Sequence, residues 1–158
     1  MTWQVSGVDQ LMQNNIKHQV KREENLLFLL DKQQLTQQIH SITQSILHPE
    51  GYYNADINIT QTANIIKIDI QKNSPVLIKQ INFNLPEHLN ESQNIKSLSR
   101  SLHALRNQKF TLQNYDNAKK LYLTYFHELG YLYASTVDSI AKVNTKTNEA
   151  TIHLNIKL

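Results

Sequence analysis

A histidine beside a glutamate is the part of this chain that comes nearest to a catalytic or metal-binding motif. His127-Glu128 matches the first half of His-Glu-x-x-His, in which two histidines on one helix face bind zinc and the glutamate acts as a base. Tyr131 occupies the position of the second histidine, no two histidines are four residues apart, and the chain has no cysteine. We therefore expect no catalytic residue, no metal ion and no cofactor, and we expect that the protein is not an enzyme.

Paired carboxylates and stacking aromatic side chains are the other groups that could carry chemistry. Asp116 and Glu128 would lie about 18 Å apart along a helix, too far for a shared acid–base step. Tyr115, Tyr122 and Tyr125 could stack on nucleic-acid bases, but their spacing places them on one helix face. We therefore expect these tyrosines to belong to a hydrophobic core.

The scarcity of glycine excludes several phosphate-binding and RNA-binding motifs. The 158-residue chain has 3 glycines, far apart, whereas P-loops, dinucleotide-binding turns and the Gly-x-x-Gly loop of K-homology domains need clustered glycines. The net charge is only +3, although the pI is near 9.0. A nucleic-acid-binding α+β module is therefore the weaker alternative, and we expect no nucleic-acid partner.

No apolar segment is long enough to cross a bilayer. The longest apolar run, residues 26–30, falls far short of the roughly 18 residues that a spanning helix needs. The first residues lack the basic start and apolar core of a signal peptide. We expect that this chain does not itself span a membrane, and its composition leaves the compartment open.

Two of the three glycines mark an internal repeat. Gly51-Tyr-Tyr-Asn-Ala55 and Gly130-Tyr-Leu-Tyr-Ala134 share Gly, Tyr and Ala at the same positions. A helical pattern precedes each glycine, and glycine commonly ends a helix in the left-handed conformation. Alternating apolar residues after each glycine predict a β-hairpin. We therefore expect structural roles, joining a helix to a hairpin, for Gly51, Tyr52, Gly130 and Tyr131.

Each copy shows the same series of a strand, a helical stripe, an amphipathic helix and a hairpin. Asp31 with Gln34 predicts a capping box on the first amphipathic helix, and Asn114 is the candidate N-cap of the second. The first stripe consists of Val8, Leu11, Met12, Ile16 and Val20, and the second of Ile95, Leu98, Leu102 and Leu105.

These patterns predict an α+β fold made of two tandem β-α-α-β-β units. We expect each unit to be a three-stranded mixed sheet covered on one face by two helices. Residues 72–75 are the natural joint, since Pro75 cannot donate to a strand ladder and Asn and Ser favour turns. The predicted domains are residues 1–73 and 74–158.

Residues of the second copy resemble a known family. Tyr115-Asp-Asn-Ala-Lys-Lys-Leu121, followed by Leu129-Gly-Tyr131 and Ala134, is similar to the Tyr-Asp-x-Ala-Lys-x-x-Leu and Gly-Tyr-x-x-Ala pattern of POTRA (polypeptide-transport-associated) domains of Omp85-family proteins. In the first copy, Gly51-Tyr-Tyr53 resembles the same pattern. Together with Pro75-Val-Leu-Ile78, it is most similar to the periplasmic N-terminal region of TamA-type members.

The resemblance implies a location, a role and partners. A tandem POTRA region would lie in the periplasm, attached to an outer-membrane β-barrel in the full-length protein, and would act as a scaffold in outer-membrane protein assembly or translocation. Its partners would be a TamB-like protein anchored in the inner membrane, unfolded outer-membrane clients and its own barrel. We expect this chain to be a fragment of such a protein. A POTRA region of another Omp85 protein or of a cell-division protein is the alternative.

The sheet edges are the predicted binding sites. An edge strand has unpaired backbone N–H and C=O groups, so an extended chain can bind by adding a strand. We predict that the strand directly after each Gly-Tyr pair is the receptive edge. Polar residues alternate with isoleucines in the first of these strands, which limits uncontrolled self-pairing. The predicted protein-binding residues are Asp56, Ile57, Asn58, Ile59 and Thr60 in the first copy and Thr136, Val137, Asp138, Ser139 and Ile140 in the second.

Overall fold

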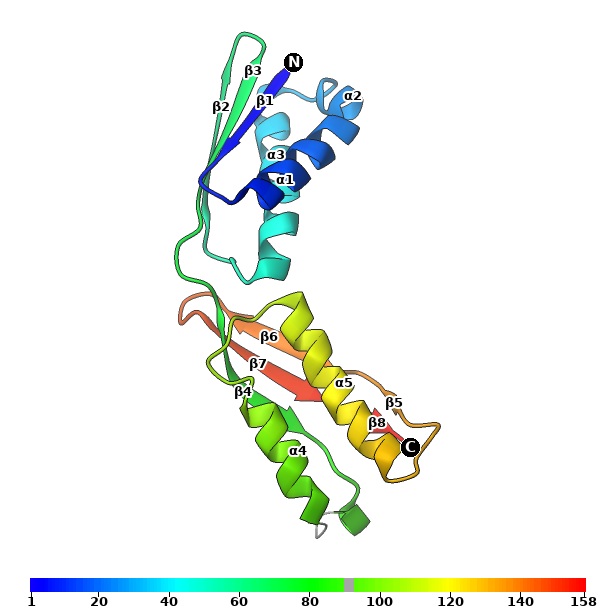
Figure 1. The fold of residues 1–158 in the computed structure, drawn as a ribbon. Helices are drawn as coiled ribbons and strands as arrows, with labels where there is room; N and C mark the ends of the chain where they lie inside the picture. Colours follow the sequence, from blue (N-terminus) through cyan, green and yellow to red (C-terminus); the bar gives the residue numbers. More distant parts are fainter. Residues whose placement is uncertain (90–92) are drawn as a thin grey trace. The chain divides into compact units, whose positions relative to one another are not determined.

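The computed structural model describes residues 1–89 and 93–158, which form two compact units, Met1–Pro75 and Val76–Leu158 (Figure 1). Each unit contains a three-stranded mixed sheet with helices, which confirms the predicted α+β fold class. The division predicted after residue 73 lies two residues before the boundary between these units, and the assignment of the two parts as separate domains stays a prediction. Within the described residues, no helix is both long and apolar enough to cross a membrane.

The first unit places its central strand last in the sequence. β3 lies between β1, to which it is parallel, and β2, to which it is antiparallel. Helix α1 packs against α3 and β1, and α3 packs against β2, so the helices cover one face of the sheet (Figure 1). The elements are β1 (Thr2–Ser6), α1 (Gln10–Arg22), α2 (Glu24–Leu27), α3 (Lys32–Leu47), the 3-10 turn η1 (His48–Glu50), β2 (Asp56–Thr62) and β3 (Ile65–Gln71).

Local capping explains where the helices of the first unit begin. The Asp9 carboxylate accepts a hydrogen bond from the Met12 N–H at 2.9 Å and starts α1. The predicted capping box of α3 is confirmed, since Asp31 and Gln34 each bond to the other's backbone N–H. The short helix α2 was not predicted, because four residues are too few to show a helical period.

The core of the first unit lies between the sheet and the helices. Alternate residues of β3, Ile66, Ile68 and Ile70, are buried, and they belong to one cluster with the buried face of α1 and α3. Leu11 is 70% exposed, so its predicted place in the buried stripe of α1 is wrong. Its neighbour Met12 takes the inward position, because two adjacent helical residues point about 100° apart.

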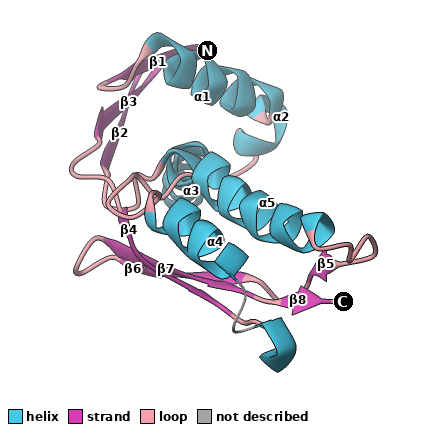
Figure 2. Ribbon diagram, turned by 60° about the horizontal axis from the view of Figure 1, so that its bottom comes forward, coloured by secondary structure: helices cyan, strands magenta, loops and turns pink. Residues whose placement is uncertain are grey.

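The second unit repeats this topology. β7 is the central strand, parallel to β4 and antiparallel to β6, and a two-stranded piece pairs β5 with β8. Figure 2 shows α4 and α5 side by side over the sheet. The elements are β4 (Leu77–Phe83), the 3-10 turn η2 (Glu87–Leu89), α4 (Gln93–His103), α5 (Leu112–Glu128), β5 (Ser135–Thr136), β6 (Ile140–Asn144), β7 (Glu149–Leu154) and β8 (Ile156–Lys157).

Helix α5 begins earlier than predicted and carries the aromatic core of the second unit. Its N-cap is Thr111, whose hydroxyl accepts from the Asn114 N–H at 3.0 Å, so the prediction of Asn114 as N-cap is wrong. Of the three tyrosines predicted to belong to the core, Tyr122 and Tyr125 are buried and each packs edge-on against Phe126, whereas Tyr115 is only half-buried. Burial raises the pKa of Tyr122 to about 12, so its hydroxyl stays protonated and donates to the Asn84 carbonyl.

Candidate functional site

The Gly-Tyr pairs have the same backbone geometry in both units. Gly51 has φ 93° and Gly130 has φ 95°, a left-handed conformation that ends each helical segment. The N–H of Tyr52 donates to the Leu47 carbonyl at 3.1 Å, and the N–H of Tyr131 donates to the Phe126 carbonyl at 3.0 Å. In both units, the bond reaches back five residues, as in the Schellman motif that closes helices. The chain then leads to β2 in the first unit and to β5 in the second.

The aromatic residues that follow these glycines have different surroundings. Tyr52 is buried, with the ammonium of Lys72 4.9 Å from its ring centroid. Tyr53 stacks on His48 with ring centroids 4.4 Å apart, and burial lowers the pKa of His48. Tyr131 is half-buried, and its hydroxyl lies 2.8 Å from His88 Nε2. These contacts join the Gly-Tyr segment to η1 and to Lys72 after β3 in the first unit, and to η2 in the second.

The first predicted edge lies on an edge strand. Residues 56–60 belong to β2, the outer strand of the order β1-β3-β2, and β2 continues to Thr62. The polar residues Asp56, Asn58 and Thr60 are exposed, while Ile57 and Ile59 are half-buried. Binding at this strand stays a prediction, but its position and its alternation are those of a receptive edge.

The ladder directs alternate backbone groups of β2 outward. The N–H of Thr2 donates to the Asn64 carbonyl at 2.7 Å. In residues 64–71, the backbone N–H and C=O groups of even-numbered residues therefore point toward β1, and those of odd-numbered residues point toward β2. In the register of β2 with β3, the residues whose N–H and C=O point away are therefore Ile57, Ile59 and Gln61. Among the described residues, no hydrogen-bond partner is found for these outward groups.

The second predicted edge, residues 136–140, is not one strand, and this part of the prediction is wrong. Asp138 has φ 46°, which breaks the strand between β5 and β6. Thr136 pairs with Ile156, whereas Ile140 pairs with His153, so the three residues 137–139 on one side oppose the two residues 154–155 on the other. This one extra residue makes a bulge, which bends the hairpin and shifts its register.

Hydrogen bonds within the second unit stabilise the bulge. The N–H of Val137 donates to the Asn155 carbonyl at 3.1 Å, and the Asn155 side chain donates to the Asp138 carbonyl at 3.2 Å. The Tyr115 hydroxyl donates to the Ser139 carbonyl at 2.8 Å. Thr136 to Ser139 are therefore engaged within the unit, and of the five predicted residues only Ile140 lies on the outer strand β6.

The outer strand of the second unit is β6, of which the predicted binding residues include only Ile140. Ala141 and Val143 are half-buried and Lys142 and Asn144 are exposed, an alternation already visible in the sequence. By the same ladder argument, the outward backbone groups belong to Ala141 and Val143. This edge offers fewer outward residues than β2.

The opposite edge of the second sheet is partly closed by the chain itself. The N–H of Ile78 donates to the Gln108 carbonyl at 2.9 Å, and the N–H of Asn107 donates back to the Ile78 carbonyl at 2.8 Å. The Arg106 side chain donates to the Lys79 carbonyl at 3.0 Å. The first half of β4 therefore cannot accept another strand, because residues 106–110 already cover it.

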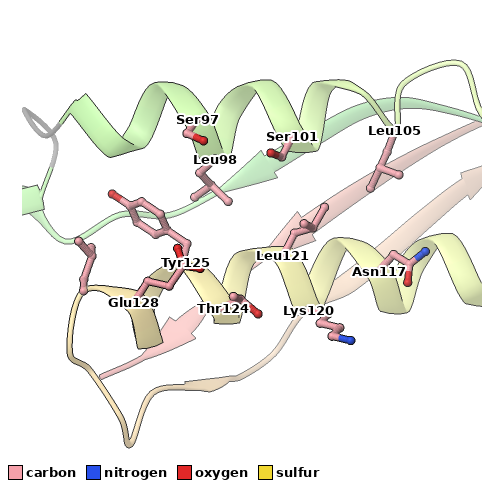
Figure 3. Close-up of a pocket in the computed structure, with 11 residues that line it drawn as sticks. Ser97, Leu98, Ser101, Leu105, Asn117, Lys120, Leu121, Thr124, Tyr125 and Glu128 are labelled. Carbon is pink, nitrogen blue, oxygen red and sulfur yellow. The ribbon is translucent and has the colours of Figure 1, made fainter.

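A groove of about 750 Å³ lies between α4 and α5 (Figure 3). Its apolar lining includes Leu98, Leu121 and Tyr125, and Lys120 and Glu128 lie on α5 beside them. Among the described residues, no three His, Asp or Glu side chains are grouped so that they could hold a metal ion. The His127 ring lies 3.3 Å from the Ala134 carbonyl, a contact at the end of α5.

Solved structures supply the only similarities found. No protein-family model matches this sequence, and no curated protein matches it. POTRA domains 3–5 of BamA from Haemophilus influenzae align over 99% of this chain and 64% of theirs, with 12% identity and a TM-score of 0.49. The N-terminal domain of Omp85 from Thermosynechococcus elongatus aligns over 97% and 60%, with 12% identity and a TM-score of 0.47.

BamA from Haemophilus ducreyi lacking POTRA domains 1–3 aligns over 99% of this chain and 29% of its own, with 18% identity and a TM-score of 0.43. The chain thus spans less than two thirds of each of these structures. Membership in their family stays a proposal for this chain.

Proposed function

We propose that the chain is a pair of POTRA domains from an Omp85-type protein and that it acts as a periplasmic scaffold in outer-membrane protein assembly or translocation. The support is the β-α-α-β-β order in both units and the Gly-Tyr pair that closes a helical segment in each. A scaffold needs binding surfaces rather than reactive groups. The described part of the chain offers sheet edges of this kind.

Strand β2 is the proposed binding edge, and the proposal rests on its backbone N–H and C=O groups that point away from β3. Ile57, Ile59 and Gln61 present three N–H and C=O pairs to an added strand. Backbone bonds are the same for every sequence, so such an edge accepts many extended chains. The exposed side chains of Asp56, Asn58 and Thr60 are short and leave room for a neighbouring strand.

The proposed ligands are unfolded outer-membrane clients and a TamB-like protein anchored in the inner membrane. Gly51-Tyr-Tyr53 and Pro75-Val-Leu-Ile78 favour a TamA-type protein within the family. In the full-length protein, the chain would be attached to an outer-membrane barrel. Strand β6, with Ala141 and Val143 outward, is a shorter second edge for the same mode of binding.

Backbone hydrogen exchange tests the proposed edge directly. In the free protein, the amides of Ile57, Ile59 and Gln61 should exchange fast, while those of Asn58 and Thr60 are protected by β3. A peptide of alternating apolar and polar residues, copied from an outer-membrane β-strand, should slow the exchange of the three outward amides. If the peptide binds without protecting any of these amides, the edge is not its site.

Substitution of Gln61 separates backbone from side-chain recognition. Gln61→Pro removes an outward N–H and should weaken peptide binding about tenfold, while the ladder to β3 stays intact. Gln61→Ala keeps the N–H and should bind like the unchanged protein. Equal loss in both variants would show that the side chain, not the backbone, is recognised.

A further inference from the structure

The edge strand β4 of the second unit is closed over its first half only. The N–H of Phe110 donates to the Val76 carbonyl at 2.8 Å, and Leu77 forms an antiparallel bridge with Lys109. Residues 107–110 therefore occupy the position of a short added strand that runs antiparallel to β4. A strand bound farther along this edge would meet that segment and could not extend past it.

The second half of β4 keeps backbone groups that point outward. The N–H of Asn84 donates to the Leu154 carbonyl at 3.2 Å, so the backbone groups of Asn82 also point toward β7. The N–H and C=O groups of Ile81 and Phe83 therefore point away from β7, and no hydrogen-bond partner for them is found among the described residues. An extended chain can add here by pairing with these groups.

A hollow of about 330 Å³ lies where the closed half of β4 meets the open half. It is lined by residues 79–82 of β4 and by His103 and Arg106 from the end of α4 and the turn after it. Arg106 donates through Nε to the Lys79 carbonyl at 3.0 Å, so its guanidinium is fixed at this point of the edge. The end of an added strand that reached residues 107–110 would lie in this hollow.

The hollow is positively charged. Lys79 and Arg106 line it, and no Asp or Glu is among the described residues that do so. The carboxylate of Glu149 lies 3.8 Å from the Lys79 Nζ and offsets one of these two charges. The Nη groups of Arg106 have no hydrogen-bond or ion-pair partner among the described residues. The surrounding sequence has the same sign, since residues 92–115 contain four Lys and Arg and no Asp or Glu.

Charge and strand direction together determine which end of a bound strand fits the hollow. A strand antiparallel to β4, in the direction of residues 107–110, would place its C-terminal end beside Lys79 and Arg106. A parallel strand would place its N-terminal end there. These cations attract a terminal carboxylate and repel a terminal ammonium. A guanidinium also binds a carboxylate through two parallel hydrogen bonds, which fixes the position of the chain end.

We propose that the second half of β4 binds the C-terminal segment of an extended polypeptide, antiparallel to β4, and that Arg106 and Lys79 hold its terminal carboxylate. Ile81 and Phe83 supply the backbone hydrogen bonds to the added strand. The β2 edge would accept any stretch of an extended chain, whereas this site recognises a free chain end. The inference therefore goes beyond the proposed function and does not depend on it.

A pair of peptides tests the recognition of the chain end. The probe is an N-acetylated hexapeptide of alternating Thr and Val with a free C-terminal carboxylate, and its control is the same peptide as the C-terminal amide. In NMR titrations of the full chain, the free acid should bind about tenfold more tightly than the amide, and the difference should shrink as salt is added. Equal affinities would overturn the proposal.

Substitution of the two basic residues separates carboxylate recognition from strand binding. Arg106→Gln should remove most of the preference for the acid and leave the affinity for the amide within about twofold, because the β4 backbone is unchanged. Lys79→Gln keeps the carbonyl that Arg106 contacts and should also lower the preference. The control is Arg100→Gln, which removes an exposed arginine of α4 that does not line the hollow and should keep the preference. A preference that survives both substitutions in the hollow would contradict the site.

Hydrogen exchange identifies the strand that the free-acid peptide occupies. The amides of Ile81 and Phe83 should exchange more slowly when the peptide is bound. Slowing confined to Ile57, Ile59 and Gln61 would overturn this inference and leave the proposed β2 edge standing. Slowing confined to β4 would support the chain-end site and count against β2.

Discussion

The three glycines of this chain are all left-handed, but the space around them differs. Gly7 has φ 86°, and a Cβ placed on it would lie 1.7 Å from the Ile70 carbonyl oxygen. Gly130 has φ 95°, and a Cβ there would meet no atom within 4 Å. The first glycine is therefore required by backbone approach and by conformation, and the second by conformation alone.

Substitution by alanine should separate these two causes. Gly130→Ala should cost about 1–2 kcal/mol of unfolding free energy, the penalty of a left-handed alanine. Gly7→Ala should cost about 3 kcal/mol or more, because the Ile70 backbone must move as well. Urea denaturation of both variants measures the difference. Equal losses would contradict the close approach of Gly7 to β3.

The stack of His48 on Tyr53 predicts a dependence of stability on pH. Burial disfavours the imidazolium and lowers the pKa of His48 in the folded protein, so the unfolded chain binds more protons at acidic pH. The first unit should lose stability as the pH falls from about 7.5 to 5.5, through the ordinary histidine pKa of about 6.5. His48→Phe keeps an aromatic ring without a titrating group.

Thermal unfolding at several pH values checks this prediction. The decrease in Tm on acidification should be smaller in His48→Phe than in the unchanged protein. An identical decrease in both would assign the effect to other groups.

Caps and turn conformations determine where the helices and strands begin and end. The Thr111 hydroxyl starts α5, and the two-residue turn that joins β2 to β3 places Ala63 at φ 49°. Asp138, at φ 46°, ends β5 and allows β6 to begin in a shifted register. The elements that form the receptive edges are thus delimited by turns and caps, while their apolar alternation fixes which side faces the core.

The two candidate caps of α5 provide a prediction at the scale of one helix. Thr111→Ala removes the acceptor of the Asn114 N–H and should destabilise the second unit by about 1 kcal/mol. Asn114→Ala removes only an exposed bond to the Lys109 carbonyl and should cost about half as much. Chemical denaturation ranks the two variants, and a larger loss in Asn114→Ala would contradict the observed cap.

The whole molecule consists of two units with separate cores. The buried cluster of the first unit contains residues from Trp3 to Ile70 only, and the second unit has its own aromatic core around Phe126. Both cores are covered by an equivalent helix layer. A defect in one core should therefore stay within its unit.

Hydrogen exchange of the full chain measures this separation. Gly7→Ala should lower protection throughout residues 1–75 and leave residues 76–158 as they are. The control is Gly130→Ala, which should have the reverse distribution. Loss of protection in both units from either substitution would mean that the two fold as one cooperative structure.

Much of this architecture was predictable from local patterns. The capping box of α3, the alternation in β2 and β3 and the glycines after each helical segment are set by neighbours a few residues apart, and the structure confirms them. The position of residues 56–60 on a strand follows from the same patterns. These features depend on helix and strand periods, which the sequence carries directly.

The features that the sequence did not predict depend on contacts between segments that are far apart in the chain. The need for Gly7 comes from Ile70 on another strand, the break at Asp138 is completed by Asn155, and the first half of β4 is closed by the segment around Gln108. Likewise, the exposure of Leu11 depends on which side chains the helices bury. A period indicates which way a side chain points along its own element, but only the packing of elements against one another determines what it meets there.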